Sequence, residues 1–415
     1  MFALRERGGA MKPRLVVIGN GMAAIRTLEE LLSAAPDKYQ ISVFGSEPYG
    51  NYNRILLSAV LAGDKTVEQI ITHPRSWYVN NGICLHTGFA KTVQTIQRHK
   101  REVITQDGTT APYDRLLIAT GSTAFVPPIA GSHLEGVMRF RDIADVEKML
   151  AYSQSQRHAI VLGGGLLGLE AANGLALRGM QVTVIHNNAV LLNRQLDAHA
   201  GQLLQRQLEQ RGLHFKMNCA TAALIGNAQG HICRADFTDG TQLPCDLFVM
   251  AVGVRPNIAL AQRARLYCER GIVVNDTLQT YDPRIYAVGE CVQHRGETFG
   301  LIAPLYAQAK VCANHLSQHG VGRYMTLPTA TQLKVTGIAL FSVGDYEGDA
   351  LCETLLFTDK ELGIYKKLVL KAGRLIGAVL YGDTSDGAWY SQLIAKQSDI
   401  TPLRETLLFG QNETE

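Results

Sequence analysis

Two glycine-rich turns, each directly after a short apolar run, constrain this chain more than any other feature. "RLVVIGNGMAA" contains the first turn, from Gly19 to Ala24, and "HAIVLGGGLLGLE" contains the second, from Gly163 to Glu170. In both copies a helical pattern follows the turn, and a second apolar run, "YQISVFGSE" or "MQVTVIH", follows the helix. This periodicity predicts a βαβ unit with parallel strands. The sequence therefore predicts two such units in one polypeptide.

The positions of the small residues in the two turns have a physical reason. The first glycine permits the tight turn, the second lets the backbone approach a diphosphate, and the third position lets the helix pack closely on its strand. These residues are Gly19, Gly21 and Ala24 in the first turn and Gly163, Gly165 and Gly168 in the second. Unpaired N–H groups at the helix N-terminus then attract the phosphates. We expect each turn to bind a dinucleotide; an ordinary glycine turn is the alternative, and the flanking strand and helix argue against it.

Composition excludes several other classes of protein. The chain has 415 residues, enough for two or three domains, and its formal net charge is +3 with no long basic run. We therefore expect it to bind neither nucleic acid nor a membrane surface. No stretch approaches the ~20 apolar residues of a membrane-spanning helix, and the N-terminus lacks the apolar centre of a signal peptide. We expect a cytoplasmic protein, with residues 1–10 as an extension before the fold.

The eight cysteines are scattered along the chain. No two are spaced as C-x-x-C or as another short metal-binding pair, so we expect no metal site. Single cysteines of this kind are typical of reduced, mostly buried thiols in a cytosolic protein. The sequence leaves the oligomeric state open.

The character of the chain changes after about Thr326. Segments such as "ALFSVGD", "TLLFTD" and "YKKLVLKAGRLIGAVLYGD" read as consecutive antiparallel strands, and "GAWYSQLIAKQ" reads as a helix. We therefore predict an α/β protein with two Rossmann-like dinucleotide-binding domains and a C-terminal α+β domain. The first domain would comprise residues 12–120 and 251–324, the second residues 121–250, and the third residues 325–415.

Two dinucleotide sites in one chain suggest that one holds a flavin and the other delivers hydride to it. A nicotinamide carries two electrons as hydride, whereas a flavin accepts the pair and can release electrons singly. The duplication therefore predicts an electron-splitting reductase. The hydride step would need close positioning of the two rings and no acid or base.

Six segments, in chain order, carry a resemblance to a known family. They are "GNGMAA", "NYNRILLSAVLAG", "LLIATGS", "GGGLLGLEAA", "AVGVRPN" and "IYAVGECVQHRGETFGLIAPLYAQAK". Together they resemble the pyridine-nucleotide-dependent flavoprotein reductases. Within that family, residues 12–396 are most similar to the FAD/NADH module in the N-terminal half of the large subunit of assimilatory-type NAD(P)H nitrite reductases. The resemblance implies FAD in the first domain and NADH in the second, with NADPH as an alternative.

The resemblance also implies roles for residues around the FAD. Glu47 would bind the adenosine ribose, although Ser46 stands where the family often has another acid. Arg54 would lie beside the FAD phosphates or the isoalloxazine; a solvated surface arginine is the alternative. Thr120 and Gly121 would pass near the flavin.

The rest of the implied FAD site comes from the later part of the chain. Gly289 and Glu290 match a family "GD" whose acid accepts hydrogen bonds from the ribityl hydroxyls. The helix that begins near Pro304 could point its N-terminus at the flavin N1–C2=O edge. Gly253 of "AVGVRPN" is also assigned to the cofactor sites.

For the second site, the resemblance places Glu170 near the nicotinamide, where it would bind the carboxamide, and we assign it the catalytic role. A solvated helix residue is the alternative. At the end of the returning strand, His186 is followed by Asn187 and Asn188, where an acid usually binds the ribose hydroxyls. No arginine appears until Arg194, so a 2′-phosphate lacks an obvious partner and we favour NADH. His186 is assigned to the cofactor, with a surface residue that makes no cofactor contact as the alternative.

The electron acceptor is the last question that the sequence raises. "NYNRILLSAVLAG" has no cysteine where related enzymes carry a redox thiol, so Cys84, Cys291 and Cys312 are expected to be packed thiols. Full-length nitrite reductases continue into iron–sulfur and sirohaem segments, which this chain does not reach before Glu415. We therefore predict an iron–sulfur or molybdenum-containing partner protein, with the catalytic subunit of an assimilatory nitrate reductase as the leading hypothesis. A nitrite reductase component, a ferredoxin or rubredoxin reductase, and an FAD- and NADH-binding redox sensor are the alternatives.

Overall fold

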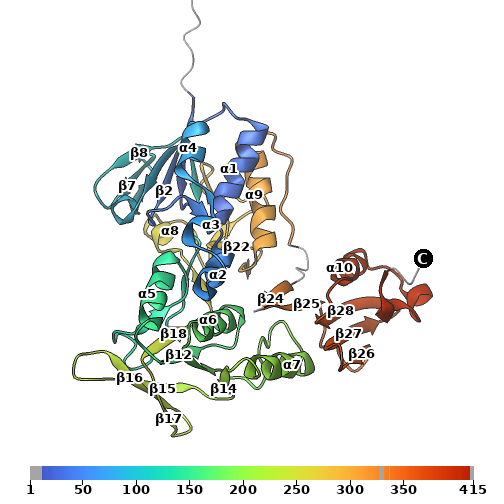
Figure 1. Ribbon diagram of the computed structural model, residues 1–415. Helices are drawn as coiled ribbons and strands as arrows, with labels where there is room; N and C mark the ends of the chain where they lie inside the picture. The colour runs from blue at the N-terminus through green and yellow to red at the C-terminus, as the bar shows by residue number, and fades with distance from the viewer. Residues whose placement is uncertain (1–11, 327–330, 336, 412–415) are drawn as a thin grey trace, which may run out of the picture. The chain divides into compact units, whose positions relative to one another are not determined.

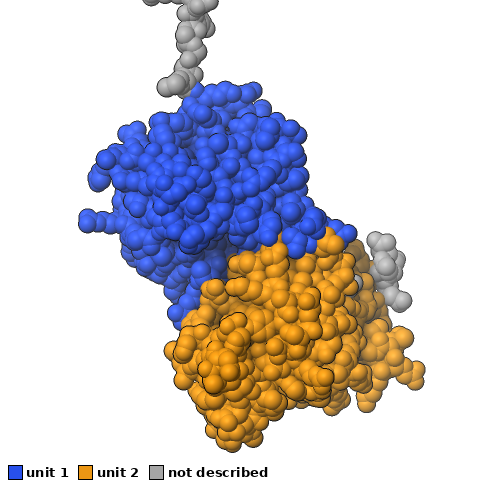
Figure 2. All heavy atoms as spheres, turned by 60° about the vertical axis from the view of Figure 1, so that its left-hand side comes forward, with its two compact units in different colours: residues 1–54, 67–123, 254–326 blue, residues 55–66, 124–253, 327–415 orange. Residues whose placement is uncertain are grey.

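The computed structural model describes residues 12–326, 331–335 and 337–411 (Figure 1). Their contacts divide the chain into two compact units, which Figure 2 colours separately. The first unit contains residues 12–54, 67–123 and 254–326, and the second contains residues 55–66, 124–253 and 331–411. Residues 55–66, which we expected in the first domain, are thus grouped with the second unit. The predicted limits of three domains stay a prediction.

The first unit is built on a five-stranded parallel sheet with the strand order β21-β9-β1-β2-β5. Its strands are β1 (Arg14–Ile18), β2 (Gln40–Gly45), β5 (Cys84–Thr87), β9 (Arg115–Ile118) and β21 (Ile285–Ala287). β1 is central, and its apolar, β-branched residues suit a strand covered on both faces. The chain continues from β1 to β2 on one side, whereas β9 lies on the other. The carboxyl end of β1 is therefore a topological switch point, where open α/β sheets bind ligands.

Helices and smaller sheets complete the first unit. Helices α1 (Met22–Ala34) and α9 (Ile302–Leu316) pack side by side (Figure 1), and the Tyr39 hydroxyl donates to the Leu316 carbonyl at 2.9 Å. The other strands are β3 (Asn51–Tyr52), β4 (Ile71–His73), β6 (Val93–Gln97), β7 (Glu102–Thr105), β8 (Thr110–Pro112), β20 (Ile272–Val274), β22 (Val292–His294) and β23 (Glu297–Thr298). The short helices are α3 (Val67–Ile70), α4 (Arg75–Asn80), η2 (Phe89–Lys91) and α8 (Ala259–Arg263).

The second unit repeats the same parallel topology, with the strand order β11-β18-β12-β13-β14. Its strands are β11 (Val137–Arg139), β12 (His158–Leu162), β13 (Gln181–Ile185), β14 (His214–Lys216) and β18 (Leu247–Met250). Its helices are α2 (Leu57–Ala62), α5 (Ile143–Ser153), α6 (Leu166–Leu177) and α7 (Ala198–Glu209), and an antiparallel sheet is formed by β15 (Thr221–Gly226), β16 (Ile232–Phe237) and β17 (Gln242–Pro244). The switch point lies at the carboxyl end of β12, between β13 and β18.

The C-terminal part of the second unit is a five-stranded antiparallel sheet with the order β24-β25-β28-β27-β26. Its elements are β24 (Thr331–Val335), β25 (Ile338–Gly344), β26 (Glu353–Asp359), β27 (Ile364–Lys371), β28 (Arg374–Tyr381), α10 (Gly387–Lys396), η3 (Thr401–Leu403) and η4 (Leu407–Phe409). α10 covers one face, and Tyr390 is fully buried there. The Tyr365 hydroxyl on β27 donates to Asp197 at 2.6 Å, and the other carboxylate oxygen of Asp197 caps α7.

Three short elements, η1 (Arg54–Leu56), β10 (Ser122–Ala124) and β19 (Val254–Pro256), lie where the chain passes from one unit to the other. The predicted fold class is confirmed: two parallel α/β sheets, each with a glycine turn, and a C-terminal α+β segment. Across the part of the chain that is described, none of the helices has both the length and the hydropathy needed to cross a bilayer.

The prediction for the cysteines was partly wrong. All eight are free, and Cys291 and Cys312 are fully buried as expected. Cys84, however, is exposed, because it begins β5, the edge strand of its sheet. Its thiol lies 3.2 Å from Nε2 of His86, two residues further along the strand. No group of three metal-ligating side chains is found among the described residues.

Candidate functional site

The first glycine turn has the geometry that a diphosphate requires. Gly19 has φ +108°, and a Cβ atom there would lie 2.1 Å from the carbonyl oxygen of Ala119, the residue after β9. Only glycine allows this approach of the turn to the neighbouring strand. At Gly21, an added Cβ would meet no described atom within 4 Å, so open space lies beside the backbone. Ala24 is fully buried, which leaves room for α1 to pack on the sheet.

The second glycine turn repeats this geometry in the other unit. Gly163 has φ +121°, and its added Cβ would lie 2.4 Å from the carbonyl oxygen of Ala251, the residue after β18. Gly165 faces open space, with no described atom within 4 Å of an added Cβ. At Gly168 a Cβ would come 1.9 Å from the Gly163 carbonyl oxygen, so a larger residue would push α6 off its strand.

The helix that follows each turn begins with free N–H groups. Gly21 is the N-cap residue of α1 and Gly165 that of α6, and in the described structure no side chain caps either helix. The first N–H groups of these helices can therefore donate hydrogen bonds to a ligand, and the partial positive charge of the helix end favours an anion. Open space, free donors and glycine geometry together fit a dinucleotide diphosphate at each turn.

The structure brings the predicted "GE" turn to the first glycine turn. A Cβ added at Gly289, which has φ +93°, would lie 3.1 Å from Cβ of Ala23 in the first turn of α1. The Gly289 N–H donates to Oε1 of Gln308 at 2.8 Å, and Gln308 is fully buried on α9. The segments around Gly19 and Gly289 therefore meet at the carboxyl edge of one sheet, as expected for the predicted FAD site.

Glu290 and the "ATG" segment also meet there. Oε2 of Glu290 accepts a hydrogen bond from the Ser122 hydroxyl at 2.8 Å and lies 4.0 Å from the position of a Cβ on Gly121, whose φ is +64°. The Thr120 hydroxyl donates to the Asn257 carbonyl at 2.7 Å. The contact predicted for Glu290 with ribityl hydroxyls stays a prediction, and Ser122 is a partner that it has within the protein.

Glu47 lies just after the carboxyl end of β2 and contacts two other side chains. Its Oε1 is 2.6 Å from Nη2 of Arg54, and its Oε2 accepts from the Tyr52 hydroxyl at 2.7 Å. The Arg54 guanidinium also lies over the Tyr52 ring, 5.0 Å from its centre. Arg54 is thus a partly buried partner of Glu47 and not a solvated surface arginine. The predicted roles of both residues toward FAD stay predictions.

Two further predicted residues lie near turns. Pro304 is in the first turn of α9, which begins at Ile302, and it is partly buried. Gly253 has φ +110°, and an added Cβ would meet no atom of the described chain within 4 Å. Both positions are compatible with their predicted roles, which remain untested.

In the second unit, Glu170 lies on the second turn of α6, two residues after Gly168. Its carboxyl is partly buried, and burial raises its pKa to about 7; a hydrogen bond from the Ser58 hydroxyl on α2 opposes this rise. The hydroxyl oxygen of Ser58 also lies 3.3 Å from the Ile55 carbonyl oxygen. Glu170 is thus not a fully solvated helix residue. A carboxyl with such a pKa exchanges protons near neutral pH, as groups at functional sites often do.

His186 follows β13 and is buried, so its alternative assignment as a surface residue was wrong. Its Nδ1 is 3.2 Å from the N–H of Gly164, in the second glycine turn, and its Nε2 is 3.1 Å from the Val190 carbonyl oxygen. Burial lowers the pKa of the imidazole. The predicted contact of His186 with the dinucleotide stays a prediction, but both ring nitrogens already have partners within the protein.

Sequence reasoning missed three residues around these sites: Ser58, Ser122 and Gln308. Each contacts a predicted residue through a side-chain hydrogen bond, which joins residues more than 100 positions apart for Ser58 and Ser122 and 19 positions apart for Gln308. All three lie inside segments that had been singled out, "NYNRILLSAVLAG", "LLIATGS" and "IYAVGECVQHRGETFGLIAPLYAQAK", and this position in the sequence was the available signal.

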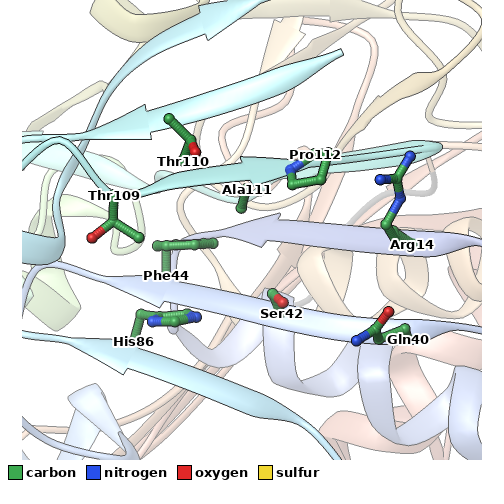
Figure 3. Close-up of a pocket in the computed structure, with 9 residues that line it drawn as sticks. All are labelled: Arg14, Gln40, Ser42, Phe44, His86, Thr109, Thr110, Ala111 and Pro112. Atoms are coloured by element: carbon green, nitrogen blue, oxygen red, sulfur yellow. The ribbon is translucent and has the colours of Figure 1, made fainter.

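One cavity of about 260 Å³ is lined by residues of the first unit (Figure 3). It is lined by Arg14, Gln40, Ser42, Phe44, His86, Thr109, Thr110, Ala111 and Pro112, and none of the predicted site residues is among them. Arg14 is paired with Asp114 at 3.1 Å, and the rings of Phe44 and His86 stack with their centres 4.5 Å apart. The cavity separates the main sheet of the first unit from β8, and it is not part of the candidate site.

Comparisons with known proteins agree with this geometry. The profile of the pyridine nucleotide-disulphide oxidoreductase family matches residues 13–331, and the profile of the rubredoxin NAD⁺ reductase C-terminal domain matches residues 329–398. The chain is 47% identical to the nitrite reductase [NAD(P)H] of Bacillus subtilis, over 94% of this chain and 48% of that protein. It is 42% identical to the assimilatory nitrate reductase electron transfer subunit of the same organism, over 96% of this chain and 51% of that protein.

A solved structure is similar over nearly its whole length. The crystal structure of NADH:rubredoxin oxidoreductase from Clostridium acetobutylicum superposes with a TM-score of 0.77 at 25% identity, covering 94% of this chain and 97% of that one. By contrast, the chain spans about half the length of the curated relatives that it matches. Proteins of the matched family are NAD(P)H-dependent oxidoreductases that bind FAD and NADH. With two glycine turns of the required geometry and a family profile that covers most of its length, the chain belongs to the pyridine nucleotide-disulphide oxidoreductase family.

Proposed function

We propose that this chain transfers electrons from NADH through FAD to a separate redox protein, and that this partner is the catalytic subunit of an assimilatory nitrate reductase. The observation that carries the proposal is the pair of glycine turns with matching geometry, one in each unit. The name of the Bacillus subtilis relative at 42% identity, an electron transfer subunit of assimilatory nitrate reductase, supports the choice of partner.

When bound, FAD would supply the chemistry of accepting an electron pair and releasing electrons singly. In this proposal the turn at Gly19–Gly21 holds the FAD diphosphate, and the turn at Gly163–Gly165 holds that of NADH. Glu47 would bind the adenosine ribose of FAD, and Glu290 the ribityl chain. Glu170 binds the carboxamide of the nicotinamide and so fixes the face of the ring.

The cysteines support an acceptor outside the chain. The segment 51–62, which carries a redox thiol in related enzymes, has none here. Burial raises the pKa of Cys291 to about 11 and also raises that of Cys312, which disfavours the reactive thiolate of both. A thiol relay therefore has no suitable member at these positions. Eight free cysteines also support a cytoplasmic location, where thiols remain reduced.

Two other acceptors have specific support. The 47% identity to a nitrite reductase supports a role as the reductase component of a nitrite reductase. The match of residues 329–398 to a rubredoxin NAD⁺ reductase domain supports a rubredoxin- or ferredoxin-type acceptor. In both cases the cofactors and the two turns keep the same roles, so only an acceptor assay separates the three.

The first experiment is an anaerobic titration of the purified protein with NADH and, separately, with NADPH, followed by flavin absorbance. We expect a yellow protein that NADH bleaches. Reduced protein is then mixed with a nitrate reductase catalytic subunit, a nitrite reductase without its own flavin module, or rubredoxin, and reoxidation is timed. Fastest reoxidation by the nitrate reductase subunit supports the proposal. A yellow protein that neither nucleotide reduces would contradict it and favour a redox sensor.

Two matched variants test the assignment of the turns. Gly21 and Gly165 have extended backbones, with φ −84° and −85°, and face open space, so Gly21→Val and Gly165→Val should fold. The new side chain would fill the place of the diphosphate. We expect Gly21→Val to lose FAD, and Gly165→Val to stay yellow but resist bleaching by NADH. The reverse pattern would exchange the two sites.

A further inference from the structure

The side chain of His186 is built into the second glycine turn. The imidazole lies beneath Gly164, the residue between the two glycines assigned to the turn, and a Cβ added there would come 2.8 Å from Cγ of the ring. The Gly164 N–H points to Nδ1 at 3.2 Å. The carbonyl oxygen of the same residue accepts a hydrogen bond from the N–H of Leu192 at 3.0 Å. Gly164 is therefore held at both its N–H and its carbonyl.

These contacts select one form of the imidazole. Nδ1 must be unprotonated to accept from the Gly164 N–H, whereas Nε2, 3.1 Å from the Val190 carbonyl oxygen, must carry a proton to donate. Only the neutral ring with its proton on Nε2 makes both hydrogen bonds. A proton on Nδ1 would set two N–H donors against each other and break the contact with the turn.

We infer that His186 is a positioning residue for the nicotinamide dinucleotide: its neutral ring holds the second glycine turn in the conformation that receives the diphosphate, and its protonation releases the turn. The inference rests on the proposed function of that turn. It gives this position a role other than the usual contact with the ribose, and it makes binding of the dinucleotide depend on pH.

The surroundings of the ring favour the neutral form. Burial lowers the pKa of His186 below its ordinary value of about 6.5, so the hydrogen bond with the turn is present at neutral pH. On the adjacent strand, the backbone carbonyl oxygen of Lys216 accepts a hydrogen bond from the backbone N–H of His186. The ammonium of Lys216 is paired with Asp239 at 2.6 Å. The thiol of Cys219, whose N–H donates to the His186 carbonyl, has a raised pKa and is neutral. The side chain of Asn193, which carries no charge, is a further polar neighbour.

The test measures binding of ADP-ribose by calorimetry between pH 5.5 and 8. This probe carries the diphosphate without the nicotinamide, so it reports on the turn and not on flavin reduction. For the wild-type protein we expect constant affinity above pH 7 and weaker binding toward pH 5.5. His186→Leu should bind at every pH about five- to tenfold more weakly than the wild type does above pH 7, the effect of losing one hydrogen bond, so the two proteins should converge toward pH 5.5. His186→Asn keeps an acceptor near the position of Nδ1, so it should restore affinity and remove the pH dependence.

A structural readout accompanies the binding data. Nitrogen NMR of the histidine rings should show His186 with its proton on Nε2 at pH 7.5. His158→Leu is the matched control, because His158 is at the first position of β12, at the amino end of the same sheet. This variant should bind ADP-ribose as the wild type does.

The outcomes separate the inference from the proposed function. Binding that is independent of pH, a proton on Nδ1, or normal affinity of His186→Leu would overturn the inference while leaving the site in place. Absence of ADP-ribose binding to the wild type at every pH would overturn both. Recovery by His186→Asn together with the Nε2–H form would support the role proposed for His186.

Discussion

Glu170 gives the sharpest stability prediction that this structure allows. The perturbation is Glu170→Gln, which keeps the shape of the side chain and removes its ionisation. Burial raises the pKa of this carboxyl from 4.5 to about 7 in the folded protein. Since one pKa unit corresponds to about 1.4 kcal/mol, ionising Glu170 in the fold costs up to about 3 kcal/mol.

The sign follows from the number of protons that each state binds. Below pH 4.5 the carboxyl is protonated in both the folded and the unfolded chain, so it has no effect on stability. Between pH 4.5 and 7 the folded chain binds more protons, and stability contributed by this group falls as pH rises. Above pH 7 the full penalty is present. We expect Glu170→Gln to be more stable than the wild type by less than about 1 kcal/mol at pH 5 and by up to about 3 kcal/mol at pH 8.5.

The assay is thermal unfolding of the FAD-loaded proteins, followed by circular dichroism at several pH values from 5 to 8.5. For a unit of this size the expected gain at pH 8.5 is several degrees in Tm. Glu209→Gln, the same substitution on the exposed part of α7, is the control and should show no gain. A difference in Tm between Glu170→Gln and wild type that stays constant with pH would refute the reasoning, because the ionisation of Glu170 is the one titration that the two proteins do not share.

Three other substitutions test contacts of the sites and of the C-terminal sheet. Gly168→Ala should lower the free energy of unfolding by about 1–3 kcal/mol, and with it Tm, because its Cβ would lie 1.9 Å from the Gly163 carbonyl oxygen; an unchanged Tm would contradict this. Ser122→Ala should change FAD affinity, measured by flavin fluorescence, about three- to tenfold, because Glu290 loses a hydrogen-bond donor; identical affinity would remove Ser122 from the site. Tyr365→Phe should cost about 1.5–3 kcal/mol in urea unfolding, because the hydroxyl donates to the carboxylate that caps α7, and a cost near zero would show that this contact is not stabilising.

The glycine turns could be predicted from sequence because their requirements are local. At Gly19 and Gly163, the residue type, the preceding strand and the following helix all lie within a few positions. The approach to Ala119 and Ala251 is a consequence of the parallel sheet that those strands form. The antiparallel C-terminal sheet was predictable for the same reason, since all its pairings except that of β25 with β28 join strands that follow each other in sequence.

The errors and omissions involve contacts between distant residues. The pattern "CLHT" does not reveal that its strand is at an edge, so Cys84 was expected to be packed and is exposed. The burial of His186 depends on how the 187–193 segment folds back over it, and the pKa of Glu170 depends on burial and on Ser58, more than 100 positions earlier. Such pairings are fixed by tertiary packing, which residue spacing does not encode.

The interleaved path of the chain has a consequence for how the protein is made and cut. The polypeptide passes between the units at 54/55, 66/67, 123/124 and 253/254, and again between 326 and 331. During synthesis, the sheet of the first unit lacks its strand β21 until residues 285–287 emerge, after all of 124–253 has been made. The ribosome therefore delivers most of the second unit before the first can finish folding. A protease that cleaves any one of these connections would nick the molecule without releasing a unit, and neither unit can be expressed as one continuous fragment.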